Sequence, residues 1–299
     1  MSVPERSCGV ADMNAHEMME ALVDPSLTRE QGIQRMIDFM APQGSRYFDA
    51  IYGSFFGREA IAAWLIPTMA EIEFIEFRPT QPPVLLDDGE GGTSLDEWQM
   101  FAGDMPLSKG VSVRRFRDGF ITWACDVYDT GPFRQPGPNG EVAPLPPAPS
   151  LEGWDRWVGT PVTAAREVDF DKDCDQFHPT DSIYIDPIFG EFRGQARIRE
   201  WMVDVMPKCG NIEFSPVGPE LNDGTTYVQE WVQMAALPSG ERVPMTRGTS
   251  VRRYRDGWTV YAADYFDTAT VMTPAVMKAS VECGSTIGVA DIMKWRSVG

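Results

Sequence analysis

Hydrophobic and polar positions in the second half of the chain first follow helical spacing. Apolar residues recur at helical intervals over 153–168 and again over 169–178, which predicts two helices, the second one shorter. A third helix is expected over 195–206, directly after a turn of small residues. Its apolar residues fall on one face and are expected to point into a core; they are Ile198, Trp201, Met202 and Val205.

Strand patterns dominate the remainder of this half. A short strand is expected over 182–186, before the third helix, and runs rich in β-branched and aromatic residues follow that helix. Asp256 and Gly257 separate the last two runs and are typical of a hairpin turn. The long strands are expected over 225–237, 244–255 and 258–266. Helices followed by a strongly bent antiparallel sheet indicate an α+β domain.

The same pattern occurs twice in the chain. The segment SVRRFRDGFITWACDVYDT, which begins at Ser112, returns without a gap as SVRRYRDGWTVYAADYFDT from Ser250. An upstream block repeats as well and pairs Asp49 with Asp186. The period of about 138 residues has the size of a domain and is too long for a solenoid repeat.

A proline-rich stretch separates the two copies. Residues 131–150 carry seven prolines, which favour an extended linker. We therefore expect two cone-shaped α+β domains whose sheets pack as an intramolecular pseudo-dimer, with further homo-oligomerisation left open. The expected boundaries are 1–132 for the first domain, 133–150 for the linker, 151–270 for the second domain and 271–299 for a C-terminal tail that could form a helix.

Charge and composition narrow the expected partners and compartment. With 26 basic and 44 acidic residues the net charge is −18, so nucleic acid and anionic membranes are not expected as partners. The sequence has no apolar run of about 18 residues and no leader pattern, which predicts a soluble, cytoplasmic protein. Five scattered cysteines, two histidines and the lack of a phosphate-binding glycine loop give no metal or nucleotide signature. The expected partner is a small molecule, with no cofactor and no metal.

Three segments resemble a known superfamily. The run YIDPIFGEFRGQARIREW begins at Tyr184, and the ends of the two final strands read ADYFD from Ala263 and CDVYD from Cys125. These segments resemble the nuclear transport factor 2-like superfamily, also called SnoaL-like, which includes ketosteroid isomerase and limonene epoxide hydrolase. The chain is similar to a tandem pair of such domains. The resemblance implies a cone-shaped, cystatin-like fold for each domain.

The resemblance also implies roles for four aspartates. Asp186 takes the position of the general base of ketosteroid isomerase, and Asp49 keeps this carboxylate without the proline that follows it. Asp264 and Asp126 take the position of an aspartate that points into the cone. Where the isomerase and epoxide hydrolase families place a further acidic residue, both copies have serine, as at Ser250. Those two activities are therefore less expected than the fold.

Strand alternation predicts which polar residues share the concave face with these aspartates. One arginine of each Arg-Arg pair enters the cone, and a glutamate from the preceding strand is placed there too. Burial raises the pKa of one carboxyl group while an arginine lowers that of its neighbour, so one can act as acid and the other as base. The expected catalytic sets are Asp49, Glu97, Arg114 and Asp126 in the first domain and Asp186, Glu230, Arg252 and Asp264 in the second.

Other interpretations stay open for these residues. Asp49 and Asp186 could form turns with nearby backbone amides, while Asp126 and Asp264 could form structural ion pairs. The two glutamates could lie on the outward face of the sheet. His178 could cap a helix, or approach the mouth of the second pocket and assist proton transfer. Besides His178, the residues expected to contact substrate are Tyr47, Tyr184 and Tyr254.

Together these residues predict a cofactor-independent acid/base enzyme acting on an apolar, aromatic small molecule, as in aromatic compound catabolism. A lyase that eliminates water or cleaves a C–C or C–O bond is expected first, because carboxylates and arginine can remove a proton and protonate a leaving group. Asp186 is then the base, Asp264 or Glu230 the acid, and Arg252 orients a substrate oxygen. The alternatives are an isomerase like ketosteroid isomerase, a polyketide cyclase, an epoxide hydrolase, or a non-catalytic module that binds a small molecule or a protein.

Overall fold

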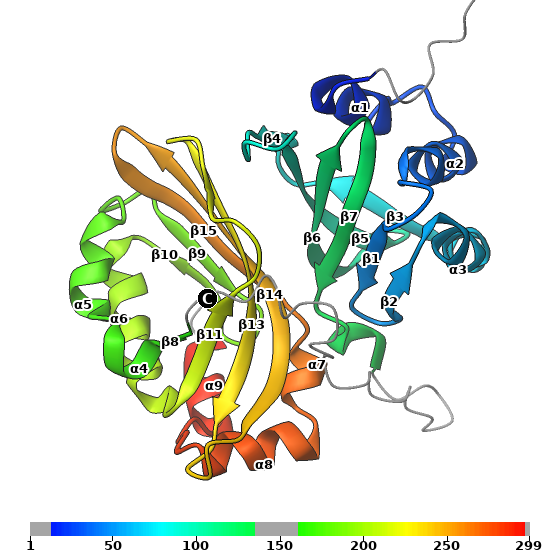
Figure 1. Cartoon of the computed structure of the whole chain (residues 1–299). Helices are drawn as coiled ribbons and strands as arrows, with labels where there is room; N and C mark the ends of the chain where they lie inside the picture. Colours follow the sequence, from blue (N-terminus) through cyan, green and yellow to red (C-terminus); the bar gives the residue numbers. More distant parts are fainter. Residues whose placement is uncertain (1–12, 135–160, 297–299) are drawn as a thin grey trace, which may run out of the picture. The chain divides into compact units, whose positions relative to one another are not determined.

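The protein folds as two compact units. The structure, a computed structural model, describes residues 13–134 and 161–296, and the chain divides into unit 1 (residues 1–126) and unit 2 (residues 127–299) (Figure 1). Each unit combines helices with one sheet, so the predicted α+β class is confirmed. No helix in the described ranges is long and apolar enough to cross a membrane. The expected linker lies outside the described residues from residue 135 onward.

Unit 1 is built on a seven-stranded sheet. In chain order its elements are α1 (Ala15–Leu22), α2 (Arg29–Phe39), β1 (Arg46–Asp49), β2 (Gly53–Phe56), α3 (Arg58–Glu71), β3 (Ile75–Pro79), β4 (Val84–Leu86), β5 (Thr93–Ala102), β6 (Met105–Arg117) and β7 (Phe120–Tyr128). The strand order is β2-β1-β7-β6-β5-β3, and β4 pairs with β5. Strands β1 and β7 are parallel, and their register places Asp49 directly beside Asp126.

Unit 2 is built on an eight-stranded sheet. In chain order its elements are η2 (Gly131–Arg134), β8 (Val162–Thr163), α4 (Ala164–Glu167), α5 (Phe170–Asp173), η3 (Cys174–Gln176), β9 (Ile183–Asp186), β10 (Gly190–Arg193), α6 (Gln195–Val205), η4 (Met206–Cys209), β11 (Ile212–Pro216), β12 (Leu221–Asn222), β13 (Thr226–Ala236), β14 (Arg242–Arg255), β15 (Trp258–Phe266), α7 (Thr268–Val271), α8 (Pro274–Glu282) and α9 (Val289–Arg296). The strand order is β10-β9-β15-β14-β13-β11-β8, and β12 pairs with β13.

The sequence repeat corresponds to a repeat of topology. Reading each sheet from its first edge, β2-β1-β7-β6-β5-β3 matches β10-β9-β15-β14-β13-β11, and β9 pairs in parallel with β15 as β1 does with β7. The predicted hairpin turn is confirmed, because Asp256 (φ 53°) and Gly257 (φ 80°) both have positive φ angles. Asp118 and Gly119 make the same turn in unit 1, with φ angles of 50° and 73°.

The helices of unit 2 agree only in part with the sequence pattern. The four apolar residues predicted to share one face of α6 are the four that are buried in it. Of the helix expected over 153–168, the described part is helical only at α4 (Ala164–Glu167), whereas Val162 and Thr163 form the edge strand β8. Val162 and Thr163 pair with Phe214 and Glu213 of β11, so backbone pairing at the edge of the sheet overrides the local helical pattern.

The segment after the repeat folds as three helices of unit 2 (Figure 1). Val276 and Ala279 of α8 are buried in a core with residues of β11, β13 and β14. Trp295 of α9 is 4% exposed and joins the core that includes Trp201. The tail is therefore part of the packing of unit 2.

Candidate functional site

Asp186 lies at the end of β9, where the chain turns toward β10. Its Oδ1 accepts hydrogen bonds from the backbone amides of Ile188 (2.8 Å) and Phe189 (2.9 Å), so it does form a turn. Burial nevertheless raises the pKa of Asp186 to about 7; the charge of Asp264 adds to this effect, and the two amides oppose it. Because both amides bond Oδ1, Oδ2 is the oxygen that can take a proton from a ligand near neutral pH.

Asp264 is the acceptor of a hydrogen-bonded chain of side chains. The Tyr184 hydroxyl donates to Asp264 Oδ2, and Ser250 Oγ donates to Oδ1 at 2.6 Å. Trp231 Nε1 in turn donates to Ser250 Oγ at 2.9 Å. Burial, followed by the charge of Asp264, raises the pKa of Tyr184 well above its ordinary value, so the phenol stays protonated and remains a donor.

Arg252 adds a cation to this chain. Its guanidinium lies 3.2 Å from Asp264 Oδ1, and its Nη2 donates to the Tyr184 hydroxyl oxygen at 3.2 Å. Burial by itself lowers the pKa of Arg252, but Tyr184 and Asp264 outweigh it and the pKa is raised, so the side chain stays charged. The Arg252 side chain is 21% exposed, which leaves part of it accessible to a ligand oxygen.

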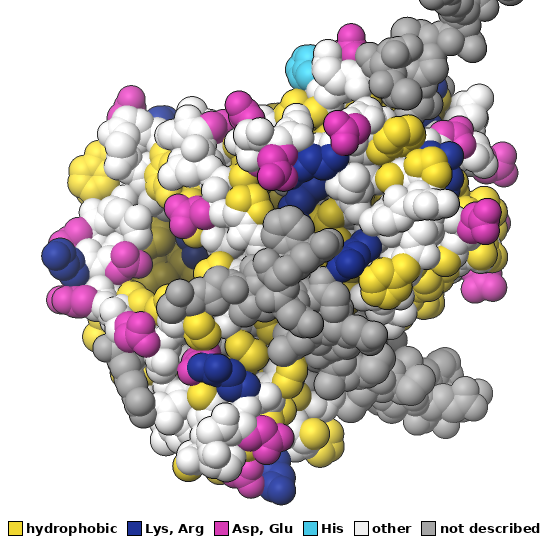
Figure 2. Space-filling model, viewed as in Figure 1, with side chains coloured by type: hydrophobic (Ala, Val, Ile, Leu, Met, Phe, Trp, Pro, Cys, Tyr) yellow, Lys and Arg dark blue, Asp and Glu magenta, His cyan; other side chains and the backbone are white. Residues whose placement is uncertain are grey.

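Two tyrosines lie near Arg252. Tyr227 is its cross-strand partner on β13, and burial, followed by the charge of Glu220, raises the pKa of Tyr227 to about 12. Tyr254 is half-buried; burial raises its pKa and the charge of Arg252 opposes the shift, so these two side chains are close. Figure 2 shows a hollow in unit 2 that is walled by hydrophobic side chains and has a basic side chain visible inside it. A cation, phenolic hydroxyls and apolar walls are what a small-molecule site requires.

Unit 1 contains the same hydrogen-bonded chain. The Tyr47 hydroxyl donates to Asp126 Oδ2, Ser112 Oγ donates to Oδ1 at 2.5 Å, and Trp98 Nε1 donates to Ser112 Oγ at 2.9 Å. Asp49 repeats the turn, since its Oδ1 accepts from the backbone amides of residues 51 and 52 at 2.7 and 3.0 Å. The framework is therefore duplicated side chain for side chain.

The arginine behaves differently in the two units. In unit 1, Arg114 donates to Asp96, its diagonal neighbour on β5. The position of Asp96 is occupied by Gln229 in unit 2, because Asp96 pairs with Ser112 and Gln229 with Ser250. The guanidinium of unit 1 is therefore held by a carboxylate that unit 2 lacks.

The apolar lining differs as well. Phe116 stands in β6 where β14 has Tyr254, and it is only 2% exposed. It belongs to a core cluster with Met18 of α1, which is fully buried. In unit 1 the concave side is thus filled by hydrophobic side chains at the point where unit 2 has half-buried tyrosines.

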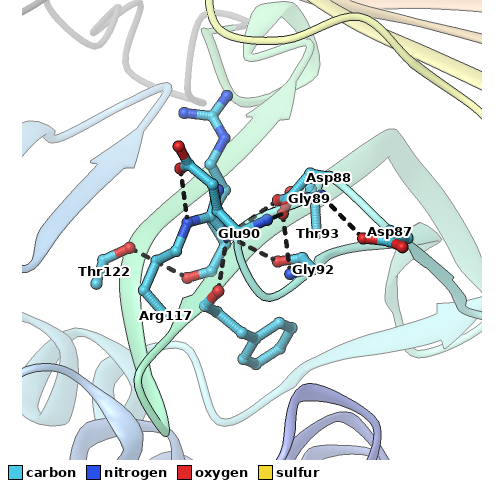
Figure 3. A network of polar contacts seen from close by, with 10 residues as sticks. Asp87, Asp88, Gly89, Glu90, Gly92, Thr93, Arg117 and Thr122 are labelled. Carbon is cyan, nitrogen blue, oxygen red and sulfur yellow. Dashed lines mark hydrogen bonds and ion pairs between the residues drawn. The ribbon is translucent and has the colours of Figure 1, made fainter.

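A loop network fixes this end of unit 1 (Figure 3). Asp88, between β4 and β5, accepts hydrogen bonds from the Gly92 amide (3.0 Å) and the Thr93 hydroxyl (2.7 Å) and pairs with Arg117 at 2.9 Å. The Phe116 amide donates to the Gly92 carbonyl at 2.9 Å. Arg117 therefore compensates part of the negative charge of this loop, and the loop is tied to the strand that carries Phe116.

The two glutamates of the expected sets lie on the opposite sheet face. Directly paired residues point to the same face, and Glu230 pairs with Thr249, whereas Gln229 pairs with Ser250, which contacts Asp264. In unit 1 the pairing of Glu97 with residue 111 gives the same result. The structure therefore corrects the expectation that Glu97 and Glu230 join the aspartates in one pocket.

His178 is held by its own turn. Its Nδ1 accepts from the Asp181 amide at 3.0 Å, and its ring packs edge-on against Trp258 with centroids 6.0 Å apart. The His178 amide bonds the carbonyl of Thr259, and the five residues from there to Asp264 correspond to roughly 16 Å of strand. His178 is thus not brought to the Asp264 cluster.

Several residues of the cluster were not expected as site residues. Trp98 and Trp231 pack their rings against neighbouring aromatic side chains, and their indole N–H groups also anchor the serines. Tyr227 was not singled out. The signal available in the sequence was the recurrence of tryptophan and serine at matched positions of both copies. Within the described residues, no group of three or more His, Cys, Asp or Glu side chains is arranged to hold a metal ion.

Comparisons with known proteins give one family match. Residues 162–261 match the family model of the SnoaL-like domain, and no curated protein matches the chain. Among solved structures, TerC co-crystallised with polyporic acid is 20% identical, covering 40% of this chain and 93% of that chain with a TM-score of 0.30. A hypothetical protein with a ketosteroid isomerase-like fold from Catenulispora acidiphila, in complex with trimethylamine, is 16% identical, with 41% and 88% covered and a TM-score of 0.31. A putative polyketide cyclase from Sinorhizobium meliloti is 21% identical, with 32% and 81% covered and a TM-score of 0.26.

The matched segment corresponds to unit 2 from β8 into β15. It includes Tyr184, Asp186 and Arg252, and it ends shortly before Asp264. Unit 1 repeats the strand order and the polar chain of this segment. Unit 2 is therefore similar to the SnoaL-like domain over residues 162–261, and unit 1 repeats its strand order.

Proposed function

We propose that unit 2 is a cofactor-independent acid/base enzyme for an apolar, aromatic small molecule that carries a carbonyl or phenolic oxygen. The observation that carries the proposal is the raised pKa of Asp186, which is about 7. The side chain interacts with Asp264, which is held in a hydrogen-bonded cluster with Tyr184 and Arg252. A carboxylate with this pKa is half protonated near neutral pH, so it can both take and return a proton.

The reaction that fits these groups best is elimination of water from a β-hydroxy carbonyl compound, a lyase reaction. Asp186 Oδ2 takes the proton from the carbon next to the carbonyl, and the electron pair moves onto the carbonyl oxygen. Arg252 stabilises this oxygen, and the Tyr184 hydroxyl helps to hold the guanidinium in place. The electron pair then returns from the oxygen, the carbonyl re-forms and a C=C bond forms as the C–O bond to the hydroxyl breaks. The departing hydroxyl takes the proton from Asp186 and leaves as water.

Asp264 has a positioning role in this scheme. Its two oxygens accept from Tyr184, Ser250 and Arg252, which holds the phenol and the guanidinium in place. The acid role is thus assigned to protonated Asp186, in preference to Asp264 or Glu230. Unit 1 carries the framework with Arg114 bound to Asp96 and with Phe116 buried, so we assign the reaction to unit 2 alone.

The test is product detection by mass spectrometry with the full chain after chelator treatment. The substrates are aryl-substituted β-hydroxyketones, enones and epoxides, and the variants are Asp186→Asn and its matched control Asp49→Asn. We expect loss of water from a β-hydroxyketone, turnover reduced at least 100-fold by Asp186→Asn, and little change with Asp49→Asn.

Other products would replace the lyase assignment. An unchanged mass with a shifted double bond indicates an isomerase, ring closure a cyclase, and gain of water an epoxide hydrolase. Stabilisation by these compounds without turnover indicates a binding module. Equal loss of activity in the Asp49→Asn and Asp186→Asn variants contradicts the assignment to unit 2.

A further inference from the structure

The C-terminal helix α9 reaches the turn that holds Asp186. Arg296, in the last turn of α9, donates from Nε to the carbonyl of Ile188 (2.5 Å) and from Nη2 to the carbonyl of Pro187 (2.7 Å). The amide of Ile188 donates to Asp186 Oδ1 at 2.8 Å. Residue Ile188 is therefore held at both ends, by the carboxylate at its N–H and by the guanidinium at its carbonyl.

Helix α9 is itself anchored to unit 2. Trp295 Nε1 donates to Asp204 Oδ2 at 2.9 Å, and Lys294 Nζ lies 2.6 Å from the same oxygen. The ring of Trp295 lies edge-on to Phe192, with centroids 6.0 Å apart. Arg296 is thus presented from a packed support rather than from a loose chain end.

We propose that Arg296 is a positioning residue for Asp186, so that the tail beyond the repeat braces the turn carrying the general base. The inference rests on the proposed function of Asp186 as the base. A side chain that fixes the turn keeps Oδ2 in one direction, and small displacements of a reacting group cost large factors in rate.

The charged and titratable groups around Asp186 come from several elements. Asp264 of β15 raises the pKa of Asp186 after the larger effect of burial, and Arg296 of α9 lowers it. Tyr184 of β9 and Cys209 of η4 also interact electrostatically with Asp186. Removing the guanidinium therefore moves the pKa of Asp186 upward, and the low-pH limb of the activity profile shifts to higher pH.

The experiment compares Arg296→Gln, Arg296→Lys and the control Lys278→Gln in the full chain. The control removes one positive charge from an exposed position of α8, where Lys278 pairs with Glu282, and leaves the anchor of α9 at Asp204 and residues 187 and 188 untouched. The first readout needs no substrate: hydrogen exchange of a peptide covering residues 187–192, which includes the amides bonded to Asp186. The second is the pH profile of kcat and KM on the substrate found as above.

We expect Arg296→Gln to speed exchange at these amides about tenfold, to lower kcat about tenfold with little change in KM, and to shift the low-pH limb upward. Arg296→Lys should restore part of each effect, and Lys278→Gln should show none of them. Unchanged exchange in Arg296→Gln, or equal exchange increases in Arg296→Gln and Lys278→Gln, overturns the proposal. Absence of turnover in the unsubstituted protein would refute the proposed function, while the exchange data still decide whether Arg296 fixes the turn.

Discussion

The hydroxyl of Tyr184 donates to Asp264 across the parallel strand pair β9 and β15, and Tyr47 makes the same contact with Asp126 in unit 1. Both tyrosines are nearly inaccessible, at 4% and 3% exposed. A largely buried carboxyl group needs hydrogen-bond donors, and each unit supplies a tyrosine and a serine. The shared contact is therefore a structural framework, and the difference between the units lies in what surrounds it.

Tyr184→Phe and Tyr47→Phe separate the contribution of this contact to stability from its contribution to turnover. Each substitution removes a hydrogen bond to a carboxylate, so each should lower the free energy of unfolding by about 1–3 kcal/mol in urea titrations. Tyr184 also accepts a hydrogen bond from Arg252, the group expected to bind the substrate oxygen, so Tyr184→Phe should lower kcat about tenfold, whereas Tyr47→Phe should leave turnover unchanged. Equal effects of the two variants on turnover would show that both units react, or that the Tyr184 hydroxyl does not position Arg252.

Much of the fold could be predicted from the sequence because the two copies of the repeat can be aligned with each other. Runs rich in β-branched and aromatic residues located β13, β14 and β15, and the Asp256–Gly257 pair located the turn between β14 and β15. The buried face of α6 followed from helical spacing alone. Alternation also placed Arg252 on the face of Asp264, since a residue and its cross-strand partner share a face.

The remaining features depend on contacts that a local pattern does not encode. Strand parity depends on register, so the face of Glu230 could be assigned only once its pairing with Thr249 was known. The retention of Arg114 by Asp96 depends on one diagonal position where the copies differ. The contact of Arg296 with residue 188 joins segments about 108 positions apart, outside the repeat altogether.

Two glycines differ in what a methyl group would meet. A Cβ at Gly248 would lie 2.3 Å from the Trp231 ring, while a Cβ at Gly32 in α2 would meet nothing within 4 Å. Gly248→Ala should therefore displace Trp231, break its bond to Ser250, and lower the free energy of unfolding by about 1–3 kcal/mol. The same change in α2, Gly32→Ala, should raise it by up to about 1 kcal/mol.

Both effects can be read from denaturant unfolding followed by tryptophan fluorescence. A Gly248→Ala variant as stable as the unsubstituted protein would contradict the close packing of Trp231 on β14.

The buried thiols of unit 2 should be unreactive in the native protein. Burial raises the pKa of Cys174 to about 11 and that of Cys209 to about 12, so the thiolate fraction at pH 8 is very small. Labelling with a chromogenic disulfide reagent should therefore proceed at the same rate in Cys174→Ser and Cys209→Ser as in the unsubstituted protein. Faster labelling of either thiol than of the unfolded chain would contradict the burial seen in the structure.

The raised pKa of Asp186 also makes the stability of the protein depend on pH. The pKa is raised from 3.8 to about 7 on folding, so the stabilising contribution of the protonated form is fully present below about pH 4 and is lost as the pH rises through 7. Above that range the folded protein bears the cost of a buried carboxylate. The Asp186→Asn substitution removes this ionisation while keeping the shape of the side chain.

Urea unfolding at pH 5.5 and pH 8.5 measures this cost directly. Asp186→Asn should stabilise the protein more at pH 8.5 than at pH 5.5, with a difference on the order of 1–3 kcal/mol. The matched variant of a solvent-exposed, ion-paired group, Asp181→Asn, should show no such gain, because its pKa is lowered in the folded state, first by Thr180 and further by His178 and Arg255. If Asp186→Asn loses the same stability at both pH values, the carboxylate only stabilises the turn. That result would contradict the proposed role of Asp186 as a base.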